Sequence, residues 1–294
     1  MLDRAVRIYP IEMWPGTVSH ERLSWPADRQ LKIELAKVEE KSMTMRTLTE
    51  SAIKNVLHRI GCDIHRYHYD KATGRSLYEP VHPQATYSPW NKDSIFLETY
   101  HAIKSNTLAD KYRCFELWSL VHQSTKLSGC LIEIGVWRGG TGALIAKRAL
   151  LSGIKAPVYL CDTFSGIVKA SDKDSTYKGY EYADTTPQAV EQLLVDLQIS
   201  NAHVLEGTFP DDTAHLIQEN TFRFCHIDVD VYQSAKEISD WIWEKMSIGG
   251  VIVYDDYGFP SCDGITKFVE EQHQNPDRII LHNLNGHAVV IKIR

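Results

Sequence analysis

Four aspartates stand in two short segments whose composition points to chemistry. Asp228 and Asp230 lie in HIDVDVYQS, and Asp255 and Asp256 lie in YDDYG. Each pair follows an apolar, β-branched run, so each is expected at the end of a buried strand. Carboxylates gathered at neighbouring strand ends repel one another unless a cation neutralises them. The two segments therefore predict a site for a divalent cation.

We predict that Asp228, Asp255 and Asp256 bind a hard cation such as Mg²⁺, which prefers oxygen ligands. Asp230 lies two residues after Asp228, so in an extended segment both side chains would point to the same side. From there Asp230 is expected to act as the general base that removes a proton from a hydroxyl group held on the metal. The alternative is that some of these acids cap the helices that follow.

A glycine-rich turn in LIEIGVWRGGTG separates a predicted strand from a predicted helix. Glycine lets the backbone approach a ligand closely, and the start of a helix offers unpaired N–H groups and partial positive charge. The spacing E-x-G-x-x-x-G-G fits a dinucleotide fingerprint poorly and favours S-adenosylmethionine. A turn without a ligand is the alternative. The residues expected to contact the cofactor here are Glu133, Gly135, Val136, Trp137, Arg138, Gly139 and Thr141.

Two further predicted strand ends, CDTFSG and EGTFPDDT, complete the expected cofactor site. In open α/β sheets, ligands bind outside the carboxyl ends of the strands. Asp162 is expected to accept hydrogen bonds from ribose hydroxyls, although it could instead cap a turn. The other residues expected beside the cofactor are Thr163, Phe164, Ser165, Gly207, Thr208, Phe209 and Asp228.

Alternating strands and helices must position these residues. Strands are predicted at 131–136, 157–162, 202–206, 223–229, 249–255, 278–283 and 287–293, and helices at 93–105, 110–123, 140–152, 187–199, 232–246 and 263–274. This alternation predicts an α/β fold with a mostly parallel seven-stranded sheet covered on both faces. Leu284, Asn285 and Gly286 predict a tight turn between the last two strands, so the C-terminal hairpin is expected to be antiparallel.

The roles of two segments and of one arginine stay open at this point. Residues 1–92 are expected to form an irregular arm and a helical extension, with a short helix around 29–41 and another at 49–61, and residues 93–294 to form the cofactor-binding domain. Arg113, on the predicted helix before the glycine turn, is either a surface ion-pair residue or a clamp at the mouth of the cofactor site. A polar loop at 166–186 is long enough to be a lid; its candidate side chains are Lys169, Tyr177, Tyr180 and Tyr182.

Composition excludes several classes of protein. The 294 residues carry a net charge of −6, with a pI of about 6.1. A nucleic-acid binder usually presents a basic surface, so no nucleic-acid partner is expected. No apolar run is long enough to predict a membrane span. Six cysteines are scattered without a CxxC pair, as in reduced proteins, and a cytoplasmic location is expected.

The segments LIEIGVWRGGTGALIA, CDTFSG, EGTFPDDT, HIDVDVYQS and GGVIVYDDYG resemble those of the macrocin-type, metal-dependent sugar O-methyltransferases. The similarity covers roughly residues 87 to 294. The resemblance implies the class I methyltransferase fold, with a Rossmann-like sheet. It implies methyl transfer from S-adenosylmethionine to a hydroxyl of a small, glycosylated acceptor, Mg²⁺ at Asp228, Asp255 and Asp256, and Asp230 as the base. It also implies a homodimer or a higher homo-oligomer.

Several alternatives stay open at this point. A catechol-type O-methyltransferase would use the same acids on a planar diol. A metal-free or hydroxylase-like relative would transfer no methyl group. A cofactor-binding module would have lost its chemistry, although four intact acids argue against that. A nicotinamide oxidoreductase fits the glycine spacing least well.

Overall fold

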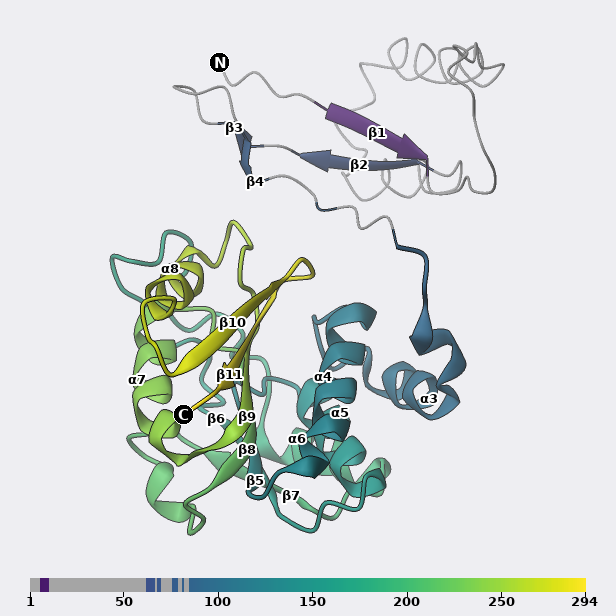
Figure 1. Cartoon of the computed structure of the whole chain (residues 1–294), viewed down its shortest axis with the longest axis vertical. Coiled ribbons are helices and arrows are strands. Elements are labelled where there is room, and N and C mark those ends of the chain that lie inside the picture. Colours follow the sequence, from purple (N-terminus) through teal and green to yellow (C-terminus); the bar gives the residue numbers. More distant parts are fainter. Residues whose placement is uncertain (1–5, 11–61, 67, 70–75, 79–80, 82–84) are drawn as a thin grey trace. The chain divides into compact units, whose positions relative to one another are not determined.

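The computed structural model describes residues 6–10, 62–66, 68–69, 76–78, 81 and 85–294 (Figure 1). The chain divides into two compact units, Met1–Pro80 and Val81–Arg294. The helices predicted around 29–41 and at 49–61 lie outside the described residues.

The described part of the first unit consists of two short antiparallel strand pairs. Strand β1 (Val6–Pro10) pairs with β2 (Cys62–Arg66), and β3 (His68–Tyr69) pairs with β4 (Ser76–Tyr78). The described residues of this unit all lie in strands, and the rest of the predicted helical extension up to Pro80 lies outside the described residues.

The second unit is built on a seven-stranded sheet in the order β10-β11-β9-β8-β5-β6-β7. Its strands are β5 (Cys130–Ile134), β6 (Val158–Asp162), β7 (Ala202–Glu206), β8 (Phe222–Ile227), β9 (Met246–Tyr254), β10 (Arg278–Asn283) and β11 (His287–Lys292). Strand β11 is antiparallel to both of its neighbours, and the remaining pairs are parallel. The predicted sheet and its antiparallel C-terminal hairpin are confirmed.

Helices cover both faces of this sheet (Figure 1). One face carries α3 (Ser94–Ile103), α4 (Lys111–Gln123), α5 (Gly140–Leu151) and α6 (Pro187–Asp196). The other carries α7 (Tyr232–Ile242) and α8 (Asp263–Gln272). Single 3₁₀ turns lie at η2 (Pro89–Lys92), η3 (Ser124–Lys126), η4 (Ala214–Leu216) and η5 (Trp243–Lys245).

The core is divided in two by the sheet. Along β5, Leu131 packs toward α3–α6 and Ile132 toward α7 and α8, and Phe224 and Cys225 of β8 divide in the same way. All four side chains are fully buried. Burial on both faces is the reason these strands have continuous apolar sequences rather than an apolar–polar alternation. Each large side chain contributes roughly 1.5–3 kcal/mol by burial.

Side-chain caps fix where the helices near the cavity begin. Asp110 accepts hydrogen bonds from the backbone N–H groups of Tyr112 (2.7 Å) and Arg113 (3.1 Å) at the start of α4. Thr186 accepts one from Ala189 (3.2 Å) at the start of α6. A cap of this kind contributes about 1 kcal/mol. The cap on α4 also sets the position of Arg113, whose side chain is buried.

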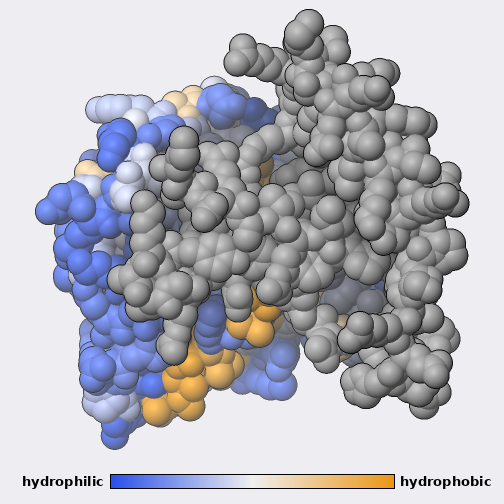
Figure 2. Space-filling model, turned by 90° about the horizontal axis from the view of Figure 1, so that it is seen from above, coloured by the Kyte–Doolittle hydropathy of each residue, from blue (hydrophilic) through white to orange (hydrophobic). Residues whose placement is uncertain are grey.

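Where the described residues are visible in Figure 2, their surface is mainly hydrophilic, and an orange strip is the most extended hydrophobic area in this view. Among the helices of the described residues, none has the length and apolar character needed to cross a membrane.

Candidate active site

A cavity of about 240 Å³ opens where the carboxyl ends of β5, β6, β8 and β9 meet. Most residues predicted for the cofactor and the metal line it: Gly135, Val136, Trp137, Thr141, Asp162, Thr163, Gly207, Thr208, Phe209, Asp228, Asp230, Asp255 and Asp256. Five predicted residues are not among its lining: Glu133, Arg138, Gly139, Phe164 and Ser165. The strand ends thus bring together segments more than a hundred residues apart in the chain, from Gly135 to Asp256.

The glycine turn is held tightly against the strand ends. Gly135 has a φ of +87°, and a Cβ atom placed there would lie 1.7 Å from the carbonyl oxygen of Asp228. Asp162 accepts hydrogen bonds from the backbone N–H groups of Val136 (2.6 Å) and Trp137 (2.8 Å). Its second oxygen accepts one from the N–H of Phe164 (2.7 Å). Asp162 therefore caps the turn, as in the alternative interpretation, while it also lines the cavity.

Glu133 has a different position from the one expected. It is fully buried in the sheet, and its carboxylate accepts a hydrogen bond from Nδ1 of His226 (2.8 Å) rather than facing the cavity. Arg138 also points elsewhere, because its guanidinium pairs with the carboxylate of Asp184. Trp137 donates from Nε1 to the same carboxylate (2.7 Å).

The 166–186 loop contributes side chains to the cavity. Tyr177 and Tyr182 line it, and Tyr177 is buried. Lys169 instead pairs with Asp211 (2.7 Å) and with Glu237. Together with Asp184, which contacts the glycine turn, these contacts hold the loop against the strand ends.

The backbone at two of the acids is unusual. Asp230 has a φ of +62° and Asp256 a φ of +60°, in the left-handed region that non-glycine residues adopt infrequently. Strand β8 ends at Ile227, so the assumption that Asp228 to Asp230 is extended is wrong. Asp228 and Asp230 nevertheless both line the cavity, because the chain turns after β8. Such conformations cluster at functional sites, where the surrounding structure compensates for the strain.

Arg113 provides a cation among the acids. Its Nη1 lies 2.5 Å from Oδ1 of Asp255 and 3.1 Å from Oδ1 of Asp256, and its Nη2 donates to the carbonyl of Leu108 (3.1 Å). Its guanidinium also lies over the ring of Phe259, 5.3 Å from the centroid. Because Arg113 is buried and lines the cavity, the interpretation as a surface ion-pair residue is wrong.

The acids differ in their tendency to ionise. Burial, reinforced by the charge of Asp255, raises the pKa of both Asp228 and Asp256 well above the usual range. Burial also raises the pKa of Asp230, with hydrogen bonds from Asp256 and Cys262 opposing the rise. Burial would raise the pKa of Asp255 too, but His287, Arg113 and His226 outweigh it and hold that pKa far below the usual range.

The donor atoms of this site suit a hard cation. Asp228, Asp230 and Asp256 have raised pKa values, and a cation among them would offset the repulsion that causes part of the rise. Among the described residues, one oxygen each from Asp228, Asp255 and Asp256 cannot be chosen so that all three lie within 4.8 Å of one another. Asp230, Asp256 and Cys262 do have one ligand atom each within 4.8 Å of one another.

Several lining residues were not foreseen from the sequence. Cys262, just before α8, has its Sγ 3.5 Å from Oδ1 of Asp230 and 3.7 Å from the hydroxyl of Tyr177. Phe259 lies in the loop between the β9 acids and α8. The loop at 106–109, before α4, closes another side of the cavity. The signal available for Cys262 and Phe259 was their place in the loop after YDDYG, at the ligand-binding edge of the sheet.

Comparison with known proteins gives a consistent result. A family model described as macrocin-O-methyltransferase (TylF) matches residues 104–289. The chain is similar to mycinamicin III 3''-O-methyltransferase of Micromonospora griseorubida, with 25% identity over 52% of this chain and 64% of that protein. It is also similar to 8-demethyl-8-(2,3-dimethoxy-alpha-L-rhamnosyl)-tetracenomycin-C 4'-O-methyltransferase of Streptomyces olivaceus, with 26% identity over 46% of this chain and 55% of that protein.

The chain therefore spans less than two thirds of the length of each of these relatives. Among solved structures, that of the O-methyltransferase NovP aligns with a TM-score of 0.57 and 20% identity, over 64% of this chain and 83% of the other. At this level of identity the likeness concerns the fold alone, and it confirms the predicted class I architecture. The match of the family model includes every predicted cofactor and metal residue.

Proposed function

The chain belongs to the macrocin-O-methyltransferase (TylF) family, and from this premise we propose that it transfers a methyl group from S-adenosylmethionine to a hydroxyl of a glycosylated small molecule. The single observation that carries the proposal is the cavity at the strand ends, which combines a glycine turn with four aspartates. The names of the relatives that act on mycinamicin III and on a rhamnosyl tetracenomycin support a sugar hydroxyl as the acceptor.

In this proposal the glycine turn and the start of α5 bind the amino-acid end of the cofactor. Gly135 permits close approach, and the N-terminus of α5 offers partial positive charge to the carboxylate. Asp162 accepts three N–H groups on its two oxygens and has capacity left on Oδ1 for a ribose hydroxyl. Phe209, buried beside Thr208, supplies an apolar surface for the adenine.

Asp230 is the proposed general base. Burial raises its pKa, and a carboxylate with a raised pKa accepts a proton more readily near neutral pH. The acceptor O–H bond breaks and its proton passes to Asp230. When bound, S-adenosylmethionine would supply its methyl carbon to this oxygen, and its sulfur would keep the electron pair of the broken carbon–sulfur bond. Positive sulfonium and developing alkoxide neutralise each other, so positioning contributes most of the catalysis.

Asp228, Asp255 and Asp256 are the proposed ligands of Mg²⁺. All three line the cavity, and their oxygens are ligands of the type that Mg²⁺ prefers. When bound, the ion would lower the pKa of the acceptor hydroxyl. Arg113 holds Asp255 and Asp256 in place for this role through the contacts given above.

The test is mass spectrometry of candidate acceptors incubated with the protein, S-adenosylmethionine and Mg²⁺. We expect a mass increase of one methylene on a glycoside and none on a matched catechol, with loss of product in EDTA and recovery on adding Mg²⁺. Methylation of the catechol alone would contradict the sugar acceptor. Activity that resists EDTA would contradict the metal.

Location and assembly stay predictions. The cysteines of the described residues are buried and unpaired, which supports a reducing compartment such as the cytoplasm. A homo-oligomer is expected from the family resemblance, and light scattering on the purified protein would test it.

A further inference from the structure

A row of charged and polar side chains crosses the sheet beneath α4, beside the cavity. Glu133 of β5 is paired in register with His226 of β8, so the two side chains lie on the same face. Asp255 follows β9, and His287 begins β11. Both histidines and Glu133 are fully buried, and Asp255 is 3% exposed. Charged groups are almost never buried to this degree unless their charge is balanced.

Each imidazole is oriented by a carboxylate outside the pair. Nδ1 of His226 lies 2.8 Å from Oε1 of Glu133, and Nδ1 of His287 lies 2.6 Å from Oε2 of Glu116 on α4. Where Glu133 and Glu116 are ionised they accept, so each Nδ1 donates and carries the hydrogen. In the neutral imidazole, Nε2 then carries the lone pair. A carboxylate behind a histidine in this way is the usual partner of a metal-binding imidazole.

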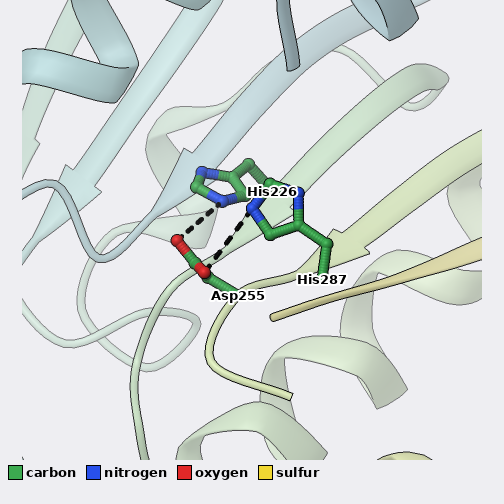
Figure 3. Close-up of side chains that lie close together, drawn as sticks. All are labelled: His226, Asp255 and His287. Atoms are coloured by element: carbon green, nitrogen blue, oxygen red, sulfur yellow. Dashed lines mark ion pairs between the residues drawn. The ribbon is translucent and has the colours of Figure 1, made fainter. Parts of the chain in front are cut away.

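Both Nε2 atoms point toward Asp255 and lie at ion-pair distance from its carboxylate oxygens (Figure 3). Nε2 of His226 lies 3.8 Å from Oδ2, and Nε2 of His287 lies 3.5 Å from Oδ1. Neither buried Nε2 atom has a hydrogen-bond partner. These separations exceed those of N–H···O hydrogen bonds, which are about 2.7–3.2 Å. They are close to the distance of roughly 3.4 Å that separates two ligands of one tetrahedral ion with bonds of about 2.0–2.1 Å.

The acids of this row outnumber its permanent cation. With both imidazoles neutral, as in their metal-binding form, Glu133, Asp255 and Glu116 are opposed only by Arg113, which leaves two negative charges. In the metal-free protein the raised pKa of His287 keeps a proton there that offsets part of this charge. Burying uncompensated charge is costly. One divalent cation in front of Asp255 would neutralise the row and would supply the missing partner of each Nε2.

We propose that His226, Asp255 and His287 bind one transition-metal ion such as Zn²⁺, in a second metal site that shares Asp255 with the all-oxygen Mg²⁺ site of the cavity. All three ligand atoms lie within 4.8 Å of one another. Two imidazoles and one carboxylate favour Zn²⁺ or a similar ion over Mg²⁺. The site ties β8 to the ends of β9 and β11, and so fixes the position of Asp255. This inference does not depend on the acceptor or on methyl transfer.

The test uses the full chain without an affinity tag, stripped with a chelator and then titrated with Co²⁺ in excess Mg²⁺. We expect visible d–d absorption that saturates near one equivalent of Co²⁺ and is abolished by Zn²⁺. His226→Gln and His287→Gln should lose this absorption. Glu116→Gln, which keeps all three ligands, should weaken Co²⁺ binding roughly 10- to 100-fold.

Two controls separate this site from others. His273→Gln removes an exposed histidine and should leave the spectrum unchanged. Asp256→Asn removes a proposed Mg²⁺ ligand and should also keep the spectrum, so failure of the Mg²⁺ proposal is distinguishable from failure of this one. A wild-type protein without d–d absorption, or a Glu116→Gln protein with unchanged Co²⁺ affinity, would overturn the inference.

Discussion

At the scale of single residues, Asp230 is the side chain on which turnover depends most directly. It lines the cavity in a left-handed conformation, and burial raises its pKa. Asp230→Asn keeps the shape of the side chain but removes the proton acceptor. We expect methyl transfer to fall roughly 100- to 10,000-fold, with cofactor affinity unchanged by calorimetry. Asp196→Asn, on α6, is the control, and turnover close to wild type in Asp230→Asn would rule out the role.

His287 makes stability depend on pH in the metal-free protein. Burial alone would lower its pKa, but Asp255 and Glu116 raise the pKa of His287 to about 9 from an unfolded value of 6.5. The raised folded value means that this contribution is fully present below about pH 6.5. It is lost as the pH rises through about 9. At about 1.4 kcal/mol per pKa unit, it amounts to about 3 kcal/mol.

Urea unfolding of wild type and His287→Gln between neutral and alkaline pH measures this contribution. The difference in unfolding free energy between the two proteins should shrink as the pH rises. A difference that stays constant across the range would mean that His287 is not held in its charged form.

The cavity acids could be predicted from the sequence because each follows a strand that is recognisable from its apolar residues. Neighbouring parallel strands end at the same edge of the sheet, so the acids were expected to lie together there. The buried row of Glu133, His226 and His287 could not be predicted. Its members come from three separate strands, and their contact depends on strand order and register. The sequence left two interpretations of Arg113 open, because the face that α4 presents to the sheet is set by packing and cannot be recognised from the sequence.

At the scale of elements, the turn after β5 depends on a glycine. Gly135→Ala would place Cβ 1.7 Å from the carbonyl oxygen of Asp228, so the turn must move away from β8. Gly153→Ala is a matched control, because Gly153 also has positive φ, +73°, but has nothing within 4 Å of the added atom. The control should cost about 1–2 kcal/mol from backbone conformation alone.

Urea unfolding and calorimetry with S-adenosylmethionine compare the two variants. Gly135→Ala should be destabilised more than Gly153→Ala and should lose cofactor binding, whereas Gly153→Ala should bind normally. Equal behaviour of the two variants would show that the close approach of β5 and β8 is not needed for the cofactor site.

Helix α4 brings a positive charge to the acids at the end of β9. Arg113→Met keeps much of the side-chain volume but leaves Asp255 and Asp256 without their guanidinium. Removing one partner of a buried pair costs about 3–5 kcal/mol. We expect a lower melting temperature without metal and partial recovery in Mg²⁺, because a divalent cation restores positive charge near the acids.

Arg223→Met serves as the comparison, since Arg223 donates to the backbone carbonyls of Gly129 (2.6 Å) and Ser124 (3.3 Å) rather than to acids. Mg²⁺ should raise its melting temperature no more than it does for wild type. A similar Mg²⁺ response in both variants would argue against a cation site at Asp255 and Asp256.

Element boundaries illustrate the limit of sequence patterns at this scale. Strands 202–206 and 278–283 were predicted with the bounds observed. Strand 223–229 was predicted too long, because Asp228 and Val229 continue an apolar alternation although the strand ends at Ile227. The chain turns after Ile227, where Gly135 lies close to the backbone of Asp228. A contact between two distant segments cannot be recognised from hydropathy or from strand propensity.

At the scale of the whole molecule, the cofactor site belongs to one unit. Every residue that lines the cavity lies between Asn106 and Cys262, inside the unit Val81–Arg294. That unit has its own two-sided core and complete sheet, which are the requirements for independent folding. We therefore expect residues 81–294 alone to unfold cooperatively and to bind S-adenosylmethionine with the affinity of the full chain.

Calorimetry of the full chain and the fragment measures this directly, and urea unfolding reports whether the fragment is folded. Because the acceptor must also be recognised, comparing turnover of a glycoside by the two proteins shows whether residues 1–80 contribute to acceptor binding: a rise in KM with unchanged cofactor affinity would assign them that role. A fragment that is folded but cannot bind the cofactor would mean that the cavity is incomplete without the first unit.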